Sequence, residues 1–251
     1  MRLLNVDKFL NGEALPFEVF WGGNQPDYAI LSHTWLEKEA EELRYQDIEN
    51  RTRKGTKGYR KIRDCCRKAK QHGHGYVWAD TCCIDKGNNV ELSEAISSMF
   101  SWYKGAKICY AYLADYDVVK KFKESKWFKR GWTLQELIAP KALVFYSHDW
   151  KYILSKSDRD MCGLISEITG ISTEVLAGEQ DALKNSSVAQ RMPWASGRKT
   201  TRPEDIAYCL LGIFGVRMSL FYSEGGKEAF IRLQKTIMKQ SDDHSLFAWS
   251  Q

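Results

Sequence analysis

Short apolar runs alternate with amphipathic segments over the first 150 residues of the chain. Four of these runs are nearly continuous and end in polar residues, as expected of strands buried on both faces of a sheet. They are Tyr28–Trp35, Tyr76–Ile84, Lys107–Leu113 and Ala142–Tyr146.

Helical periodicity is present between these runs. Apolar residues at helical spacing from Tyr59 to Ala69 predict a helix over residues 58–71. The spacing from Leu92 to Tyr103 predicts a second helix, with an asparagine at position 88 or 89 as its N-cap. A short third helix is predicted over residues 131–138.

Alternation of this kind predicts an α/β fold, in which a mainly parallel sheet has helices on both faces. The pattern from about residue 151 to residue 251 is mainly helical, and a buried stripe is expected from Ile206 to Phe214. The sequence contains no clear linker. We therefore expect one domain over residues 1–251, with an α/β core over about 1–150 and a helical extension over about 151–251.

Polar residues follow two of the predicted strands. In parallel sheets, ligands bind beyond the carboxyl ends of the strands. Ser32, His33 and Trp35 end the first strand, and Asp80 and Asp85 lie at the end of the second. These five side chains are candidate ligand-binding residues.

Composition narrows the class of protein. The chain has 251 residues, of which 43% are hydrophobic, and this content argues against disorder. No apolar run approaches the roughly 20 residues that cross a bilayer, and the first seven residues are too polar for a signal peptide. A soluble cytoplasmic protein without membrane contacts is expected. The seven cysteines lack disulfide or C-x-x-C spacing, so we expect reduced thiols and no metal site.

Positive charge is concentrated in one block. Residues 51–70 contain ten Lys or Arg residues and one acid, Asp64, whereas the net charge of the chain is only +5. Such a block suits nucleic acid, an acidic partner or a phosphate-bearing ligand. A solvated helix face explains it more simply, so nucleic acid is not the expected partner.

Five stretches along the chain together resemble the heterokaryon-incompatibility (HET) domain of fungal cell-death proteins. They are Tyr28–Trp35, Val77–Asp85, Trp127–Leu137, Arg191–Asp205 and Asp243–Trp249. Their order and spacing cover almost the whole chain. The resemblance implies a role in non-self recognition and programmed cell death, and it implies the other domains of a larger receptor as partners.

A more distant similarity concerns the Toll/interleukin-1 receptor (TIR) fold, a flavodoxin-like parallel sheet. TIR domains that hydrolyse NAD carry a Trp, three intervening residues and then the catalytic Glu. Trp132 and Glu136 match that spacing. The similarity implies NAD or a related nucleotide as a substrate rather than a cofactor, Glu136 as the catalytic residue, and self-association of the chain.

The short predicted helix supports a site on physical grounds as well. At 100° per residue, Leu134, Leu137 and Ile138 form one apolar stripe, and Trp132 and Glu136 lie one turn apart on a different side. An indole can stack on a nicotinamide or adenine ring. A carboxylate can stabilise the positive charge that grows as a glycosidic bond breaks. Burial beside apolar groups would raise the pKa of that carboxyl.

Simpler structural roles compete with these assignments. Glu136 can pair with Lys129 or Arg130 on a helix surface, His33 can order its loop, and Asp85 can cap the following turn. Trp35 is suited to the core. A thiol hydrolase that uses Cys83 and His33 is another class, but adjacent cysteines in an apolar strand favour buried thiols.

Arginines in the second half of the chain also have two interpretations. Arg191, Arg198 and Arg202 either bind phosphates or pair with Glu204 and Asp205. The segment leads into a predicted helix, which favours structural pairing.

Two functional hypotheses follow. The leading one is a fungal cell-death effector domain that hydrolyses the N-glycosidic bond of NAD or a related nucleotide without a metal or cofactor. Glu136 would be catalytic, and the substrate-binding residues would be Ser32, His33, Trp35, Asp80, Asp85 and Trp132. The alternative is a non-catalytic signalling module that triggers cell death by assembling with protein partners through its basic face.

Overall fold

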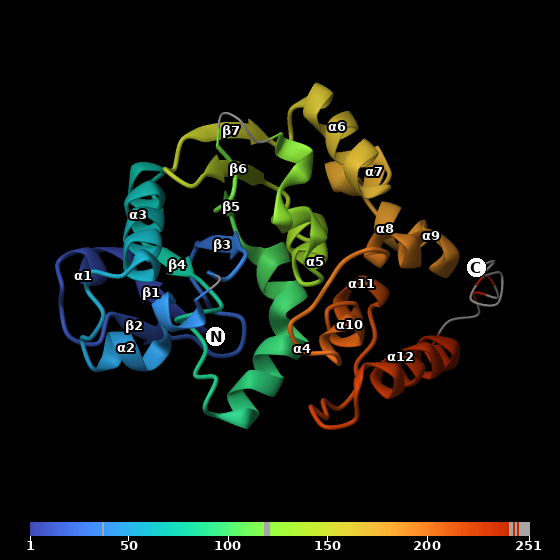
Figure 1. The fold of residues 1–251 in the computed structure, drawn as a ribbon, viewed down its shortest axis with the longest axis horizontal. Helices are drawn as coiled ribbons and strands as arrows, with labels where there is room; N and C mark the ends of the chain where they lie inside the picture. The colour runs from blue at the N-terminus through green and yellow to red at the C-terminus, as the bar shows by residue number, and fades with distance from the viewer. Residues whose placement is uncertain (37, 118–120, 241–242, 244, 246–251) are drawn as a thin grey trace.

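A seven-stranded mixed sheet forms the centre of the first half of the molecule in the computed structural model, which describes residues 1–36, 38–117, 121–240, 243 and 245. The strand order is β2-β1-β4-β3-β5-β6-β7 (Figure 1). The strands are β1 (Arg2–Asn5), β2 (Phe17–Val19), β3 (Ala29–His33), β4 (Tyr76–Trp78), β5 (Ile108–Leu113), β6 (Leu143–Ser147) and β7 (Tyr152–Ser155).

The four central strands β4, β3, β5 and β6 are parallel, and β1, β2 and β7 are added antiparallel at the two edges. Numbered along the chain, the parallel strands lie in the order 2-1-3-4, so the order reverses between β3 and β5. A ligand is expected beyond the carboxyl ends of the strands at such a point. The predicted α/β class is confirmed, whereas the three antiparallel strands were not predicted.

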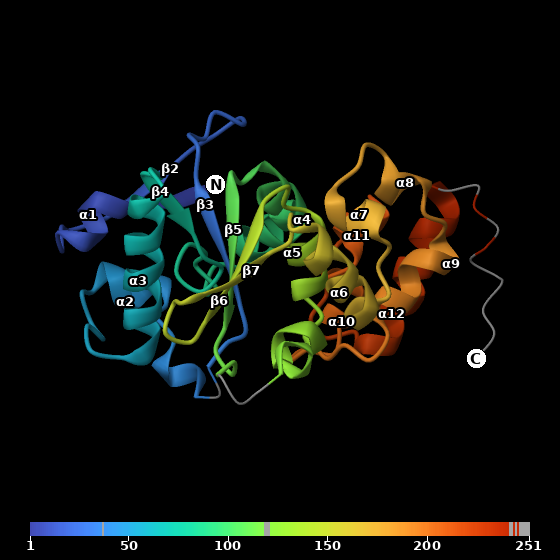
Figure 2. The ribbon, with the colours of Figure 1, turned by 90° about the horizontal axis from the view of Figure 1, so that it is seen from above.

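Helices cover both faces of the sheet. The helices α1 (Val6–Leu10), α2 (Tyr45–Glu49) and α3 (Lys57–Gln71) lie on one face, and α4 (Asn89–Gly105) and α5 (Thr133–Ile138) lie on the other (Figure 2). The predicted N-cap of α4 is confirmed at Asn88, whose side chain accepts bonds from the backbone N–H groups of Val90 and Glu91.

The chain beyond β7 packs against α4 and α5, as Figure 2 shows, and is helical as predicted, although β7 itself lies past the expected boundary near residue 150 and belongs to the sheet. Its helices are α6 (Arg159–Thr169), α7 (Thr173–Ala177), α8 (Ala182–Asn185), α9 (Val188–Arg191), α10 (Asp205–Tyr208), α11 (Leu211–Phe214) and α12 (Gly226–Gln240). The expected stripe from Ile206 to Phe214 is divided between α10 and α11, and Ile206 is exposed rather than buried.

One predicted strand is shorter than its apolar run. We expected Tyr76–Ile84, but β4 ends at Trp78, and the chain then turns with the backbone N–H of Cys83 bonded to the carbonyl of Ala79 at 2.8 Å. Cys82 and Cys83 are still buried, so the apolar run reflects a buried turn as well as a strand. The turn carries Asp80 out of the sheet.

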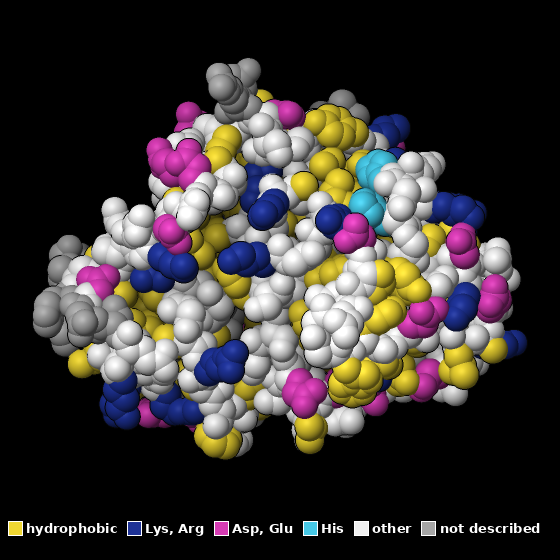
Figure 3. All heavy atoms as spheres, turned by 180° about the vertical axis from the view of Figure 1, so that it is seen from behind, with side chains coloured by type: hydrophobic (Ala, Val, Ile, Leu, Met, Phe, Trp, Pro, Cys, Tyr) yellow, Lys and Arg dark blue, Asp and Glu magenta, His cyan; other side chains and the backbone are white. Residues whose placement is uncertain are grey.

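Much of the basic block on α3 is neutralised within the fold. Lys61 is buried against Glu42 at 2.7 Å, and Lys70 reaches Asp7 at 2.6 Å. Arg63 and Arg67 both contact Asp64. On the face of the molecule in Figure 3, Lys and Arg side chains are dispersed among acidic, apolar and other side chains. In the described part of the chain, no helix is long and apolar enough to span a membrane.

Candidate active site

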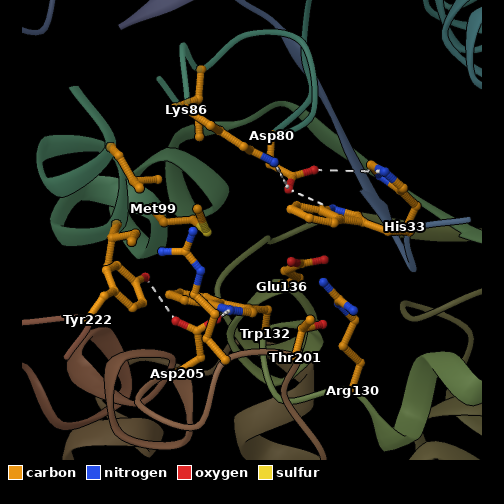
Figure 4. A pocket seen from close by; sticks show the side chains of 15 residues that line it. His33, Asp80, Lys86, Met99, Arg130, Trp132, Glu136, Thr201, Asp205 and Tyr222 are labelled. Carbon is orange, nitrogen blue, oxygen red and sulfur yellow. Dashed lines mark hydrogen bonds and ion pairs between the residues drawn. The ribbon is translucent and has the colours of Figure 1, made fainter. Parts of the chain in front are cut away.

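A cavity of about 180 Å³ lies where the carboxyl end of the sheet meets the helical extension. Its walls come from the ends of β3 and β4, from α4, from the segment that leads into α5, and from residues 201–205 and 222 of the extension. Figure 4 shows side chains from the two halves of the chain facing one another across it. This is the position that the strand-order reversal favours.

Glu136 lines this cavity and is 7% exposed. The short helix α5 turns Leu134 and Leu137 into the core. The hydroxyl of Ser32, at the end of β3, donates a hydrogen bond to Oε2 of Glu136. Ser32 itself is fully buried, and its Oγ accepts a hydrogen bond from Nε1 of Trp127 at 2.8 Å. Ser32, which is not among the residues lining the cavity, therefore positions the carboxyl group of Glu136 from the protein interior.

The carboxyl group of Glu136 has an altered affinity for its proton. Burial, together with the negative charge of Asp80, raises the pKa of Glu136 to about 8, against the opposing effects of the Ser32 bond and the Arg130 charge. Glu136 is therefore mainly protonated at pH 7 in the free protein. A buried carboxyl with a shifted pKa in a cavity is typical of a functional site.

Asp80 is the second acid in the cavity, and its environment lowers its pKa instead of raising it. Burial alone would raise its pKa, but the charges of Lys86 and Arg130 and a bond from Trp35 hold the pKa well below its usual range. Its Oδ2 accepts bonds from Nε1 of Trp35 at 2.9 Å and from Nζ of Lys86 at 3.3 Å. Asp80 is thus an ionised carboxylate beside a mainly protonated Glu136.

His33 lies between these groups as a neutral imidazole. Burial and the charge of Lys61 lower its pKa to about 4, although Asp80 acts in the other direction. Its Nε2 lies 3.8 Å from Oδ1 of Asp80, and neither ring nitrogen has a hydrogen-bond partner among the described residues. An unpartnered buried polar group costs free energy, which a ligand bonded to it would offset.

Trp35 is held by the loop that follows β3. Glu42, buried against Lys61, accepts a bond at 2.7 Å from the backbone N–H of Leu36 and so fixes this loop. Nζ of Lys86 lies 3.7 Å from the ring centroid of Trp35, and the guanidinium of Arg130 lies 5.3 Å from it. The indole is therefore neither a core residue nor an empty stacking surface, because cations of the protein already contact it.

Trp132 joins the core to the extension. Its Nε1 donates to Oδ2 of Asp205 at 3.0 Å, and the hydroxyl of Tyr222 donates to Oδ1 of the same carboxylate at 2.9 Å. Burial raises the pKa of Asp205, and these two bonds oppose that shift. The indole of Trp132 lines the cavity beside Glu136, as the spacing of the two residues predicted.

The structure places Asp85 outside this cavity. Its Oδ1 accepts bonds from Nε2 of Gln46 at 2.5 Å and from the backbone N–H of Gly87 at 3.0 Å. This arrangement is the turn-capping role that competed with ligand binding. Cys83 is also directed elsewhere, because its thiol contacts the backbone of Val77 and Ala79.

Several cavity residues have no counterpart among the predicted site residues. They are Lys86, Arg130, Thr201, Asp205 and Tyr222, together with the apolar wall from α4. Arg202 also lines the cavity; the sequence left phosphate binding and structural pairing open for it and favoured pairing. Arg202 and Asp205 lie at the end of the fourth of the five motifs, so the motif itself could have indicated them as cavity residues.

Arg191 and Arg198 donate hydrogen bonds to the carbonyls of Ile213, Trp194 and Arg130 rather than pairing with Glu204 or Asp205. Among the described residues, no group of three or more His, Cys, Asp or Glu side chains could hold a metal ion.

Comparison with known proteins identifies the family. Residues 28–122 match the family model described as heterokaryon incompatibility protein (HET). Over 250 residues the chain is 44% identical to the vegetative incompatibility protein HET-E-1 of Podospora anserina, a match that covers 95% of this chain. The chain belongs to the heterokaryon-incompatibility family.

The matches cover only part of the relative, and the C-terminal end of the chain matches a different family model. The chain spans about 18% of the length of the Podospora relative. Residues 228–251, which include most of α12 and the fifth motif, match a domain of unknown function. Of that motif, Asp243 and Ser245 lie within the described residues, where they accept bonds from the backbone at the start of α9. No solved structure matches this chain.

Proposed function

We propose that this HET domain hydrolyses the N-glycosidic bond of NAD or a related nucleotide, and that this reaction is its effector function in fungal incompatibility. The observation that carries the proposal is the environment of Glu136, a buried carboxyl with a pKa of about 8 in a cavity shared with Trp132 and Asp80. The name of the Podospora relative supports the incompatibility role.

The chemistry of a pyridinium glycoside suits this site. When its glycosidic bond breaks, the electron pair of the bond passes to the ring nitrogen, and the base leaves neutral without needing a proton. The attacking water adds its oxygen to the anomeric carbon and must lose one proton. A group with a pKa near 8 accepts that proton effectively near neutral pH once it is ionised. Among the described residues that line the cavity, Glu136 has this property.

Binding of the substrate would itself favour the ionised form of Glu136. A pyridinium cation placed beside the carboxyl lowers the pKa of Glu136, because an opposite charge stabilises the carboxylate. The carboxylate then stabilises the oxocarbenium-like charge on the ribose as the bond breaks. The bond from Ser32 holds the carboxylate oxygen of Glu136 in place, and the indole of Trp132 offers a face on which the departing nicotinamide ring can stack.

The neighbouring groups have separate roles in this mechanism. Asp80 stays ionised and is suited to accept bonds from ribose hydroxyls. It lines the cavity, and among the described residues no hydrogen bond to its Oδ1 is present, the imidazole of His33 being 3.8 Å away. The unpartnered nitrogens of His33 offer a further donor or acceptor to the same hydroxyls.

Incubation of the purified chain with NAD, at high protein concentration, tests the proposal directly. We expect release of nicotinamide and ADP-ribose, measured by chromatography, and a loss of at least about 100-fold with Glu136→Ala and Glu136→Gln. Glu228→Gln, a change at an exposed glutamate on α12, is the control and should leave the rate unchanged.

A second readout separates the enzyme from the signalling module. Expression of the Glu136→Gln variant in fungal cells should abolish killing if hydrolysis is the effector function. Killing that persists in this variant, with no turnover of NAD or related nucleotides by the wild-type chain, would reject the proposal in favour of non-catalytic assembly.

A further inference from the structure

Two arginines that line the cavity form no salt bridge with an acid among the described residues. Among the described residues, the guanidinium groups of Arg130 and Arg202 make no ion pair and donate no hydrogen bond. Each instead lies against an aromatic ring: Arg130 is 5.3 Å from the ring centroid of Trp35, and Arg202 is 4.3 Å from that of Tyr222. Cation–π contacts of this kind restrain a guanidinium without using its N–H donors.

The two arginines reach the cavity from different halves of the molecule. Arg130 belongs to the core segment that leads to Trp132 and Glu136, and Arg202 precedes α10 in the extension. The charge of Arg130 lowers the pKa values of Glu136, Asp80 and Asp205, so its guanidinium lies within electrostatic range of all three acids. In Figure 4, Arg130 lies next to Glu136.

The balance of charge in the cavity favours an anion. Lys86, Arg130 and Arg202 supply three positive charges, and Asp80 and Asp205 supply two negative charges when ionised. Glu136 adds almost none at neutral pH, because its pKa is about 8. The Asp80 charge is already paired with Lys86, and the Asp205 oxygens already accept bonds from Trp132 and Tyr222. Bonds from neutral donors leave the negative charge of Asp205 in place, and both arginines interact with that charge. Once Asp80 is paired with Lys86 and Asp205 balances one arginine, one positive charge of the arginine pair remains uncompensated.

We propose that Arg130 and Arg202, supported by Lys86, form a subsite for the phosphate groups of the ligand, so that the cavity takes nucleotides that carry a diphosphate and discriminates against nucleosides. The planar guanidinium fork matches phosphate oxygens in a bidentate way, which gives both charge and direction. A site built to bind a charged group rejects an analogue that lacks it, because its own donors are then left without partners. The identity of the bond that is cut still rests on the proposed function above.

Binding measurements test the subsite without any turnover. We expect inorganic pyrophosphate and ADP to bind the wild-type chain in titration calorimetry, with adenosine at least 10-fold weaker than ADP. Arg130→Gln and Arg202→Gln should each raise the Kd for pyrophosphate by about 10-fold or more. Arg217→Gln, which changes an exposed arginine at a different groove, is the matched control and should bind like the wild type.

Arg130→Lys checks that a loss at this position reflects recognition rather than misfolding. It keeps the charge and removes the fork, so it should retain the wild-type unfolding temperature and bind pyrophosphate less tightly. Pyrophosphate that does not bind the wild type, or that binds Arg130→Gln and Arg202→Gln as tightly as the wild type, overturns the subsite.

A comparison of substrates then separates this inference from the proposed function. NAD should be hydrolysed with a kcat/KM at least about 100-fold above that of nicotinamide riboside, and the double change Arg130→Gln with Arg202→Gln should remove most of that ratio. Equal rates for the two substrates overturn the subsite and leave hydrolysis intact. Pyrophosphate binding without hydrolysis of either substrate supports the subsite and rejects the proposed function.

Discussion

Glu136 holds its proton at a cost to the stability of the protein. In the unfolded chain its pKa is near the ordinary value of 4.5, whereas in the fold it is about 8 because the carboxyl is desolvated. Below pH 4.5 Glu136 is protonated in both the folded and the unfolded chain, so its ionisation does not change the free energy of unfolding. Between pH 4.5 and 8 only the unfolded state releases the proton, so rising pH favours unfolding by up to about 1.4 kcal/mol per unit.

The change Glu136→Gln removes this effect, since an amide does not ionise. We expect its unfolding free energy, relative to the wild type, to rise by several kcal/mol between pH 5 and pH 8. Urea unfolding at four or five pH values measures the difference, and Glu228→Gln serves as the control. A difference that is independent of pH would show that Glu136 titrates normally in the fold.

The same ionisation should govern catalysis. If the carboxylate form accepts the proton of water, kcat/KM for NAD rises about tenfold per pH unit below pH 8 and levels off above it. His33, with a pKa of about 4, stays neutral over this range, so its ionisation does not alter the shape of the pH–rate profile. A profile that is flat or falls between pH 6 and pH 9 contradicts the assignment of Glu136 as the base.

Sequence reasoning found the part of the site that lies at strand ends and on the short helix. Ser32, His33 and Asp80 follow from the rule for parallel sheets, and Trp132 and Glu136 from their spacing. It gave Asp85 a binding role because a strand end alone does not show which way a following turn directs its side chains. Tyr222 left no signal, because it reaches the cavity only through the packing of the extension.

Helices α4 and α11, from the two halves of the molecule, approach each other closely at a glycine. An added Cβ at Gly212 on α11 would lie 2.2 Å from the Cβ of Phe100 on α4. Since both groups belong to helices, the contact can be relieved only by moving one helix away from the other. Helix α4 also provides the apolar wall of the cavity, so its position matters for the site.

We therefore expect Gly212→Ala to destabilise the protein by about 1–3 kcal/mol through overpacking. Thermal unfolding followed by circular dichroism measures the effect. Gly163→Ala on α6 is the control, because an added Cβ there meets nothing within 4 Å, and it should be neutral or slightly stabilising. Equal unfolding temperatures for the two variants would mean that α4 and α11 are not tightly packed.

The sequence predicted α3 and α4 and the four central strands, but it missed the three strands at the sheet edges. The helix expected over residues 58–71 is α3, Lys57–Gln71, because four turns give a clear periodicity. The strands β1, β2 and β7 have only 4, 3 and 4 residues, which is too few for an alternating pattern to be recognised. Their place at the sheet edges is decided by pairing with strands distant in sequence.

At the scale of the whole molecule, the core and the extension share one site. Trp132 bonds to Asp205 across the boundary, and the backbone of Gly131 and Lys129 exchanges bonds of 2.9 and 2.7 Å with Lys199. Arg198 of the extension donates to the carbonyl of Arg130 at 3.0 Å. Removal of the extension would therefore expose the elements that hold Glu136 and would take away one wall of the cavity.

These contacts lead us to expect that residues 1–251 unfold as one cooperative unit. Scanning calorimetry should give a single transition whose calorimetric and van't Hoff enthalpies agree, although a chain of this length commonly shows more than one. A fragment of residues 1–158, which keeps β7, should lack a cooperative transition, because its α4 and α5 would have lost the helices that cover them. Two resolved transitions in the full chain, or a fragment that unfolds cooperatively, would show instead that the core is a domain in its own right. In that case the pocket would lie between two domains, and pyrophosphate would raise the temperature of one transition toward the other.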